Sequence, residues 1–504
     1  MGSASEFDLK NIQGDIWPGF TKRYEQFFFF NIQDAGDFRP GLRGLADHVI
    51  TSSHDALVNR AAIHKVKQPA SSEPGIVGNL INLTGSVIHA IHDALPAHHD
   101  IPRTKGPTDD VGLAQVNISF TVRGMTKLGK GRFKDDPFLK GMFADMVGQG
   151  RDEAKDWLPE FKDGSVDGVL LVCGTEHEVK KKVKDLSQKY LGPSQGVRHL
   201  LTLDGKERPG DQKGHEHFGF LDGISQPLIK GLDDETIKLP GSRKVPTRPG
   251  IILLGHDGEM ENVPQLMHPE WAKDGSLFVV RKMRQFVPEF NSFLESQAPR
   301  LNFTPEQLAA RLVGRWKSGA PVELCPDEDN KKYATWNDFD FPLDNQLNCP
   351  FASHMRKTKG RGMMNDRDIF DIMRRGIPHG PEVGLDEKEN SKTVLDRGLI
   401  FTCYQSSLCN GFQFIKNRWI NPDTFPADRT DFTDGMNPGQ DVIVGQSVKG
   451  AIEEDDKLLY TCVYDSNKVH NKVTFEPFVQ SNGCDYFFTP SLKLLGDLSV
   501  AQAV

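Results

Sequence analysis

Three charged or titratable residues stand in segments whose composition could serve chemistry. Asp222 is the single acid of HFGFLDGISQP, a run of aromatic, apolar and glycine residues. His354 follows a Pro-Phe pair in CPFASHMRKTKGR, and Arg374 is the first arginine of the pair in IMRRGIPHG. Carboxylate, imidazole and guanidinium groups are suited to proton transfer, metal ligation and stabilisation of developing negative charge, respectively.

Each segment alone also has an ordinary structural interpretation. An unpaired carboxylate is costly to bury, so Asp222 is either a working group or a turn residue whose oxygens are satisfied. A lone histidine is more often a satisfied polar residue than a ligand, and an arginine pair before glycine is more often a salt-bridge feature. Four histidines lie close together, but their spacing fits no zinc site. These are His89, His92, His98 and His99.

In combination and in this order, the segments resemble those of the dye-decolorizing peroxidases. The resemblance rests on NIQGDIWPGF, GFLDGISQP, CPFASHMRKT, and RRGIPHG followed by GLIFTCYQ, and it extends over roughly residues 8–490. It implies a peroxidase that uses hydrogen peroxide to oxidise dyes, phenolics and related aromatic donors. The length and insertions are similar to those of the fungal members, which are typically secreted, so we expect an extracellular protein whose signal peptide has been removed.

The resemblance also assigns roles to the three residues. His354 matches the proximal iron ligand of a non-covalently bound haem b in the second of two domains. Asp222 matches the distal catalytic acid and Arg374 the distal arginine. The chain has no CxxCH motif, so covalent attachment of a c-type haem is excluded by the usual rule.

Further positions follow from the same resemblance. Leu399 and Phe401 match apolar residues that line the distal side of the haem. Trp419 lies where some fungal members have a surface tryptophan that relays electrons, and we expect it to be an exposed contact for bulky reductants. Two positions depart from the family: Lys359 replaces a frequent asparagine, and His379 replaces a frequent tyrosine, which argues against a tyrosyl relay there.

The residue types suit the implied reaction. The pKa of a free aspartate, about 3.9, leaves Asp222 ionised at most working pH values, ready to accept a proton from peroxide and return it. The same pKa favours activity on the acid side. Arg374 keeps its charge throughout and can stabilise the oxygen that departs.

The elements that must position these residues follow from hydrophobic periodicity. Strands are predicted at 26–32, 114–125, 168–174, 217–220, 250–256, 276–286, 398–405 and 411–419, and helices at 136–150, 176–191, 289–301 and 304–319. The order in each half approximates βαββαβ, so we predict an α+β fold of two ferredoxin-like domains with antiparallel sheets. The boundaries are 8–235 and 236–504, and the resemblance adds the dimeric α+β barrel superfamily.

Composition excludes several other classes. The chain of 504 residues has a formal net charge of −8, which argues against nucleic acid as a partner, and no apolar run could span a membrane. Mn(II) is a further candidate reductant, but the acid-rich segments 233–235, 327–330 and 453–456 are typical of solvated loops and predict no manganese site. The seven cysteines include no CxxC pair and are expected to be mostly buried thiols.

Two alternatives to a peroxidase remain open at this point. One is a haem-binding or haem-handling protein without a peroxidase role. The other is a structural protein of two domains in which Asp222 and His354 are turn residues.

Overall fold

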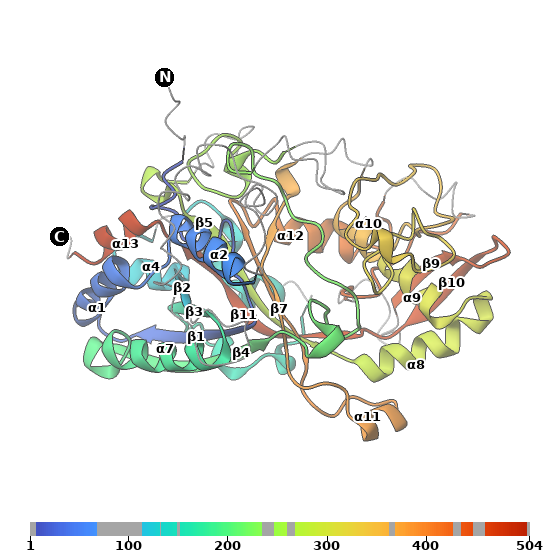
Figure 1. The fold of residues 1–504 in the computed structure, drawn as a ribbon, viewed down its shortest axis with the longest axis horizontal. Helices are drawn as coiled ribbons and strands as arrows, with labels where there is room; N and C mark the ends of the chain where they lie inside the picture. The colour runs from blue at the N-terminus through green and yellow to red at the C-terminus, as the bar shows by residue number, and fades with distance from the viewer. Residues whose placement is uncertain are drawn as a thin grey trace.

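The computed structural model describes residues 7–67, 113–131, 133–148, 152–233, 246–259, 268–361, 368–426, 435–446 and 459–500. Within these residues the chain is an α+β fold built on one antiparallel sheet with nine strands and on a separate strand pair (Figure 1). The four-histidine cluster and the predicted domain boundary lie outside the described residues, so the boundary stays a prediction.

The first half of the sheet has the ferredoxin-like strand order. Its strands are β1 (Tyr24–Ile32), β2 (Gln115–Phe120), β3 (Gly168–Gly174) and β4 (Val197–Lys206). They lie in the order β4-β1-β3-β2, with α1 (Ala35–His48) following β1 and α7 (Glu176–Lys189) following β3. All nine residues of β1, YEQFFFFNI, are buried, because both faces of this central strand are covered.

The second half repeats this order. Its strands are β5 (Ser276–Gln285), β6 (Met373–Arg374), β7 (Ile377–His379), β8 (Gly398–Gln405) and β11 (Val479–Thr489). They lie as β11-β5-β8-β6, and β7 also pairs with β8, so β6 and β7 together stand where the first half has β2. The prediction of an α+β fold with antiparallel ferredoxin-like units is confirmed.

The other helices and the separate strand pair lie outside this sheet. They are α2 (Ser53–Lys67), α4 (Val122–Lys127), α5 (Asp136–Lys140), α6 (Met142–Met146), α8 (Val287–Gln297), α9 (Pro305–Val313), α10 (His354–Thr358), α11 (Leu385–Glu389), α12 (Phe412–Phe414), a π-helix (Ile415–Ile420), α13 (Leu492–Leu498), and the strand pair β9 (Leu459–Tyr464) and β10 (His470–Phe475).

Two contacts turn the two halves into one body. β11 pairs with β5 along its length and meets β2 at Phe488 opposite Phe120. At the other edge, Gly205 of β4 lies so close to Ile377 of β7 that a Cβ atom on Gly205 would overlap the isoleucine side chain. The sheet therefore curls until β4, at one end of the strand order, reaches β7 of the second half.

Several predicted elements differ from the structure. The helix predicted at 136–150 is divided at Gly141 into α5 and α6, and the helix predicted at 304–319 ends at Val313. Residues 217–220 form a glycine turn, and β4 is the fourth strand instead. Residues 250–256 form a turn that begins at Pro249, and residues 411–419 form α12 and the π-helix. The strand predicted at 114–125 ends at Phe120, because the Thr121 side chain caps α4 by accepting from the backbone N–H of Gly124.

Candidate active site

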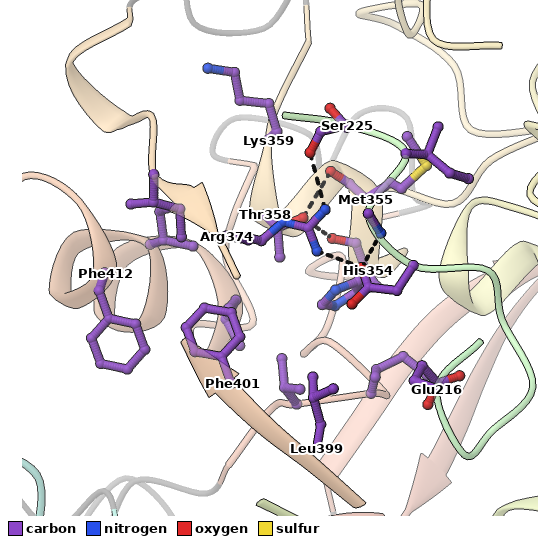
Figure 2. Close-up of a pocket in the computed structure, with 18 of the residues that line it drawn as sticks. Glu216, Ser225, His354, Met355, Thr358, Lys359, Arg374, Leu399, Phe401 and Phe412 are labelled. Carbon is purple, nitrogen blue, oxygen red and sulfur yellow. Dashed lines mark hydrogen bonds and ion pairs between the residues drawn. The ribbon is translucent and has the colours of Figure 1, made fainter. Parts of the chain in front are cut away.

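A cavity of about 340 Å³ lies in the second half of the molecule, between the Asp222 segment and α10. This volume lies within the range of small-molecule and cofactor sites. Asp222, His354, Arg374, Leu399 and Phe401 all line it, so the structure brings these five predicted site residues together. Figure 2 shows Arg374 and His354 close together, with Leu399 and Phe401 beside them.

Asp222 and Arg374 form an ion pair within the cavity wall. Arg374 Nη1 donates to Asp222 Oδ1 at 2.8 Å, and the same oxygen accepts from the backbone N–H of Gly223 at 2.6 Å. Among the described residues no donor is assigned to Oδ2, which leaves this oxygen available for a substrate. Burial alone would raise the pKa of the Asp222 carboxyl, but the Arg374 guanidinium outweighs burial and holds the pKa below its usual value.

Gln226 locks the backbones of the two segments together. Its side-chain amide donates to the Arg374 carbonyl at 3.0 Å and accepts from the Arg374 N–H at 3.1 Å. Arg374 Nη2 also donates to the Ser225 carbonyl at 3.1 Å. The relative position of the acid and the arginine is therefore fixed by both backbone and side-chain contacts.

His354 stands at the first turn of α10 with one ring nitrogen engaged. Its Nδ1 lies 2.7 Å from Oδ2 of the buried Asp441. Burial alone would lower the pKa of His354, but Asp441 raises it above its usual value. A carboxylate at Nδ1 fixes the proton there and leaves Nε2 as a lone-pair donor, the arrangement common for metal-bound histidine.

Asp441 was not predicted from the sequence. It lies 87 residues after His354, in PGQDVIVGQ, where an acid before an apolar run indicates only a turn or cap. In the structure its Oδ1 accepts from the backbone N–H groups of Ile443 and Val444, so this ordinary role is also present. Only the fold reveals that the second oxygen faces His354.

The second arginine of the pair has a different task. Arg375 donates to the carbonyls of Asp15, Ile16 and Pro18 at 2.9–3.0 Å. It therefore holds NIQGDIWPGF, the first of the family-like segments, against the strand break beside Arg374.

The two positions that depart from the family are also placed. Lys359 lines the cavity and forms an ion pair with Asp371. His379 is buried, and its Nε2 lies 3.0 Å from the Met283 carbonyl. Burial lowers the pKa of His379 to about 4, so its ring is neutral over most of the pH range.

Trp419 is not exposed, and this expectation is wrong. The π-helix places its side chain in an aromatic cluster with Phe370, Phe414 and Phe425, and only 3% of the residue is accessible. The helical conformation turns this side chain inward, whereas the predicted strand at 411–419 did not determine which way it points. A bulky reductant cannot touch this indole directly, and an electron-relay role at Trp419 stays a prediction.

The residues of the cavity fit a haem. Its walls combine apolar side chains with a histidine whose Nε2 has no partner among the described residues and with a carboxylate–guanidinium pair. The apolar side chains that line it include Leu399, Phe401, Phe412, Ile415 and Ile443. An apolar pocket that offers an imidazole nitrogen and a separate carboxylate–guanidinium pair has the groups that a haem with an open coordination position requires.

Comparison with known proteins identifies the family. Residues 11–89 and 78–209 match the family model described as DyP dimeric alpha+beta barrel domain, and residues 256–437 match that described as Dyp-type peroxidase, C-terminal. The chain is 35% identical to dye-decolorizing peroxidase msp1 of Mycetinis scorodonius, over 98% of this chain and 88% of that protein. The protein belongs to the dye-decolorizing peroxidase family.

Further relatives agree with this assignment. A dye-decolorizing peroxidase of Mycena epipterygia is 33% identical, over 98% of this chain and 87% of its own. The solved structure of an ancestral D-type dye-decolorizing peroxidase is 38% identical, with a TM-score of 0.81 over 98% of this chain and all of that chain. The protein is therefore a peroxidase of a haem-enzyme family, and the alternatives without peroxidase activity lose their support.

The described residues also bear on membrane spans, metal clusters and cysteines. No described helix is long and apolar enough to cross a bilayer. No group of three His, Cys, Asp or Glu side chains within the described ranges could hold a metal ion, and residues 453–456 lie outside those ranges. All seven cysteines are free thiols, and all but Cys409 are buried.

Proposed function

We propose that this dye-decolorizing peroxidase binds haem b non-covalently through His354 and reduces hydrogen peroxide with the help of Asp222 and Arg374. The observation that carries the proposal is the arrangement around one cavity: the Asp222–Arg374 pair, joined at 2.8 Å, and His354, held by Asp441 at 2.7 Å, both line it. Bound haem would supply the redox chemistry, taking electrons from an aromatic reductant and passing them to peroxide.

The chain's own residues would handle the proton. Oδ2 of Asp222, the oxygen left available, accepts a proton from hydrogen peroxide and returns it to the oxygen that leaves as water. The lowered pKa of Asp222 keeps the carboxylate ready for this transfer in mildly acidic solution. Meanwhile Arg374 donates hydrogen bonds toward the negative charge that builds on the departing oxygen.

His354 and Asp441 would act on the opposite side. The Asp441 carboxylate holds the Nδ1 proton, so Nε2 keeps the orientation and lone pair needed to bind iron. Leu399 and Phe401 exclude water from the reaction space, which strengthens the interactions made by Asp222 and Arg374.

Dyes and phenolics are proposed as reductants. A solved dye-decolorizing peroxidase in complex with 2,6-dimethoxyphenol is 32% identical to this chain, with a TM-score of 0.78 over 98% of it, which supports a phenolic donor. No manganese site is proposed. The extracellular location is proposed from the resemblance to fungal members, and detection of the natural protein in culture filtrate would test it.

The decisive experiment is Asp222→Asn in the haem-loaded protein. The variant should retain the Soret band, and its rate of reaction with hydrogen peroxide should fall about 10²–10⁴-fold, the usual contribution of a positioned acid–base group. Stopped-flow absorbance measures both properties in one sample. An unchanged rate at unchanged haem content would refute the role of Asp222, and unchanged haem occupancy in His354→Ala would refute the ligand assignment.

A further inference from the structure

We propose that Glu216 is a positioning residue of the distal face: its carboxylate fixes the loop of residues 216–222 in the conformation that presents Asp222. This inference rests on the proposed role of Asp222. Glu216 lies six residues before Asp222 and is among the residues that line the same cavity (Figure 2). The proposed reaction has no direct use for it.

The two carboxylate oxygens of Glu216 close the loop from inside. Oε2 accepts from the backbone N–H of Phe218 and Oε1 from that of Phe220, both at 2.9 Å. The backbone of Glu216 adds two bonds, since its N–H donates to the Phe220 carbonyl and its carbonyl accepts from the N–H of Gly219. One residue therefore engages three of the next four backbone N–H groups.

This closed turn leads directly into the catalytic segment. The N–H of Leu221 donates to the Lys317 carbonyl at 3.1 Å, and the N–H of Asp222 donates to the Gly214 carbonyl at 3.0 Å. Gly219, inside the turn, has a φ of +96°, a left-handed conformation that glycine adopts without strain. The path of the backbone into Asp222 therefore depends on the turn that Glu216 closes.

A third donor anchors the turn to the sheet. Gln285, the last residue of β5, donates from Nε2 to Glu216 Oε2 at 2.5 Å, and its own backbone N–H donates to the Arg397 carbonyl. Glu216 thus connects a loop to the rigid end of a central strand.

The charge of Glu216 points to the same role. Within the described residues no Lys or Arg side chain forms an ion pair with it, and burial raises its pKa. A carboxylate without a cationic partner is costly to bury. The three donors from Phe218, Phe220 and Gln285 therefore stabilise its charge in the cavity wall. An amide has one acceptor oxygen, so glutamine cannot satisfy both N–H groups in the way two carboxylate oxygens do.

The test is a double-mutant cycle in the full-length, haem-loaded protein. Glu216→Gln preserves shape but turns one acceptor into a donor, so the loop should loosen and the rate of reaction with hydrogen peroxide should fall at least tenfold. A displacement of about 1 Å in a reacting group can cost about 10²-fold. In an Asp222→Asn background the same substitution should cause less than a twofold further change, because Glu216 acts only through Asp222.

Hydrogen exchange supplies a readout that does not depend on turnover. Amides of residues 218–222 should exchange faster in Glu216→Gln, while the Soret band keeps its position and intensity. Should Glu216→Gln fold poorly, Gln285→Met is the milder variant: it removes only the side-chain donor and should slow the peroxide reaction by a smaller factor, again only when Asp222 is present.

Asp485 offers a matched control. Its Oδ1 accepts the backbone N–H groups of Met142 and Tyr486, and burial raises its pKa to about 6, but it does not line the cavity. Asp485→Asn should leave the peroxide rate within twofold of the parent.

The outcomes separate the two proposals. Equal slowing by Glu216→Gln in both backgrounds, or no slowing at all, would overturn the positioning role even when Asp222→Asn behaves as expected. If Asp222→Asn itself leaves the rate unchanged, the proposed function fails first.

Discussion

The two halves of the sheet share a strand order but differ in what fills them. In the first half, Phe30 of β1 contacts Phe38 and Phe120, with ring centroids 5.9 and 6.2 Å apart, and the interior is packed with aromatic side chains. In the second half the matching interior space holds the cavity. The strand that corresponds to β2 is broken into β6 and β7, and the break follows Arg374.

At this edge of the second half, two adjacent arginines connect the cavity with the first half. Adjacent residues of an extended chain point to opposite faces. At the break, the adjacent arginines serve different regions: Arg374 points to the cavity, and Arg375 binds carbonyls of residues 15–18 in the first half. The two adjacent arginines therefore supply both the cavity-lining group that we propose to be catalytic and a tie between the halves.

Phe30→Ala should produce the largest effect, and only on stability. Removing this fully buried ring should lower the free energy of unfolding by about 3–5 kcal/mol, while the Soret spectrum of the folded protein stays unchanged. Chemical denaturation followed by circular dichroism measures the loss. A loss of haem-binding free energy as large as the loss of stability would show that packing in the first half also determines the cavity in the second half.

Replacing each arginine by leucine should separate their tasks. Arg374→Leu should retain the fold but slow the reaction with peroxide about 10²–10³-fold, the usual cost of losing a donor to developing charge. Arg375→Leu should instead leave three carbonyls without their donor and lower stability by about 1–3 kcal/mol in total. Stopped-flow rates and melting curves on both variants provide the comparison, which fails if the two phenotypes coincide.

Two buried histidines predict loss of stability in acid. Burial lowers the pKa of His217 and of His379 to about 4 from an ordinary value of 6.5, so the folded protein stays unprotonated where the unfolded chain binds a proton. Stability is therefore complete above pH 6.5 and falls between pH 6.5 and 4, by about 3 kcal/mol per histidine.

His217→Gln checks this effect directly. The variant keeps a side-chain donor for the His379 carbonyl, which His217 Nε2 contacts at 2.9 Å, but removes the titrating ring. Its free energy of unfolding should depend less steeply on pH between 6.5 and 4. Parallel curves for the variant and the parent protein would contradict the assignment.

Asp441→Asn should produce the smallest change, a loss of haem affinity in the second half, which holds the cavity. Loss of the charge behind His354 should weaken haem binding about 10–100-fold, as is typical when a partner of a metal-bound histidine is removed. Competition for haem with apomyoglobin measures the affinity. His199→Ala, which removes a ring stacked on Phe28 in the first half, is the control and should leave haem affinity unchanged.

The sequence predicted the strands whose composition has a single interpretation. GVLLVCG and GLIFTCYQ form strands with the predicted bounds, because short apolar runs rich in β-branched residues fit a buried sheet. The strand predicted for GFQFIKNRW was wrong, because its spacing of apolar and polar residues also fits a helix. In the structure, tertiary packing buries Ile415, Trp419 and Ile420 on one side of that helix. The strand predicted for GIILLGH was wrong, because this segment forms a turn that begins at Pro249 and includes Gly255, which has a positive φ.

The site was predicted where residue type and order carried the information. Asp222, Arg374, His354, Leu399 and Phe401 all meet at the cavity. Asp441 and Glu216 could not be predicted, since their partners are, respectively, a ring 87 residues away and backbone N–H groups that any acid could cap. The burial of Trp419 depends on a π-helix, for which the sequence carries no clear pattern.

The position of β11 also bears on synthesis. It is the last of the described strands in sequence order, yet it lies in the middle of the sheet, between β2 and β5. Until its residues leave the ribosome, both half-sheets expose an unpaired edge, the kind of surface that invites association with other chains. The two half-sheets are therefore joined only once residues 479–489 have been synthesised, and a haem in the cavity that Val479 and Ser481 help to line could be enclosed only after that.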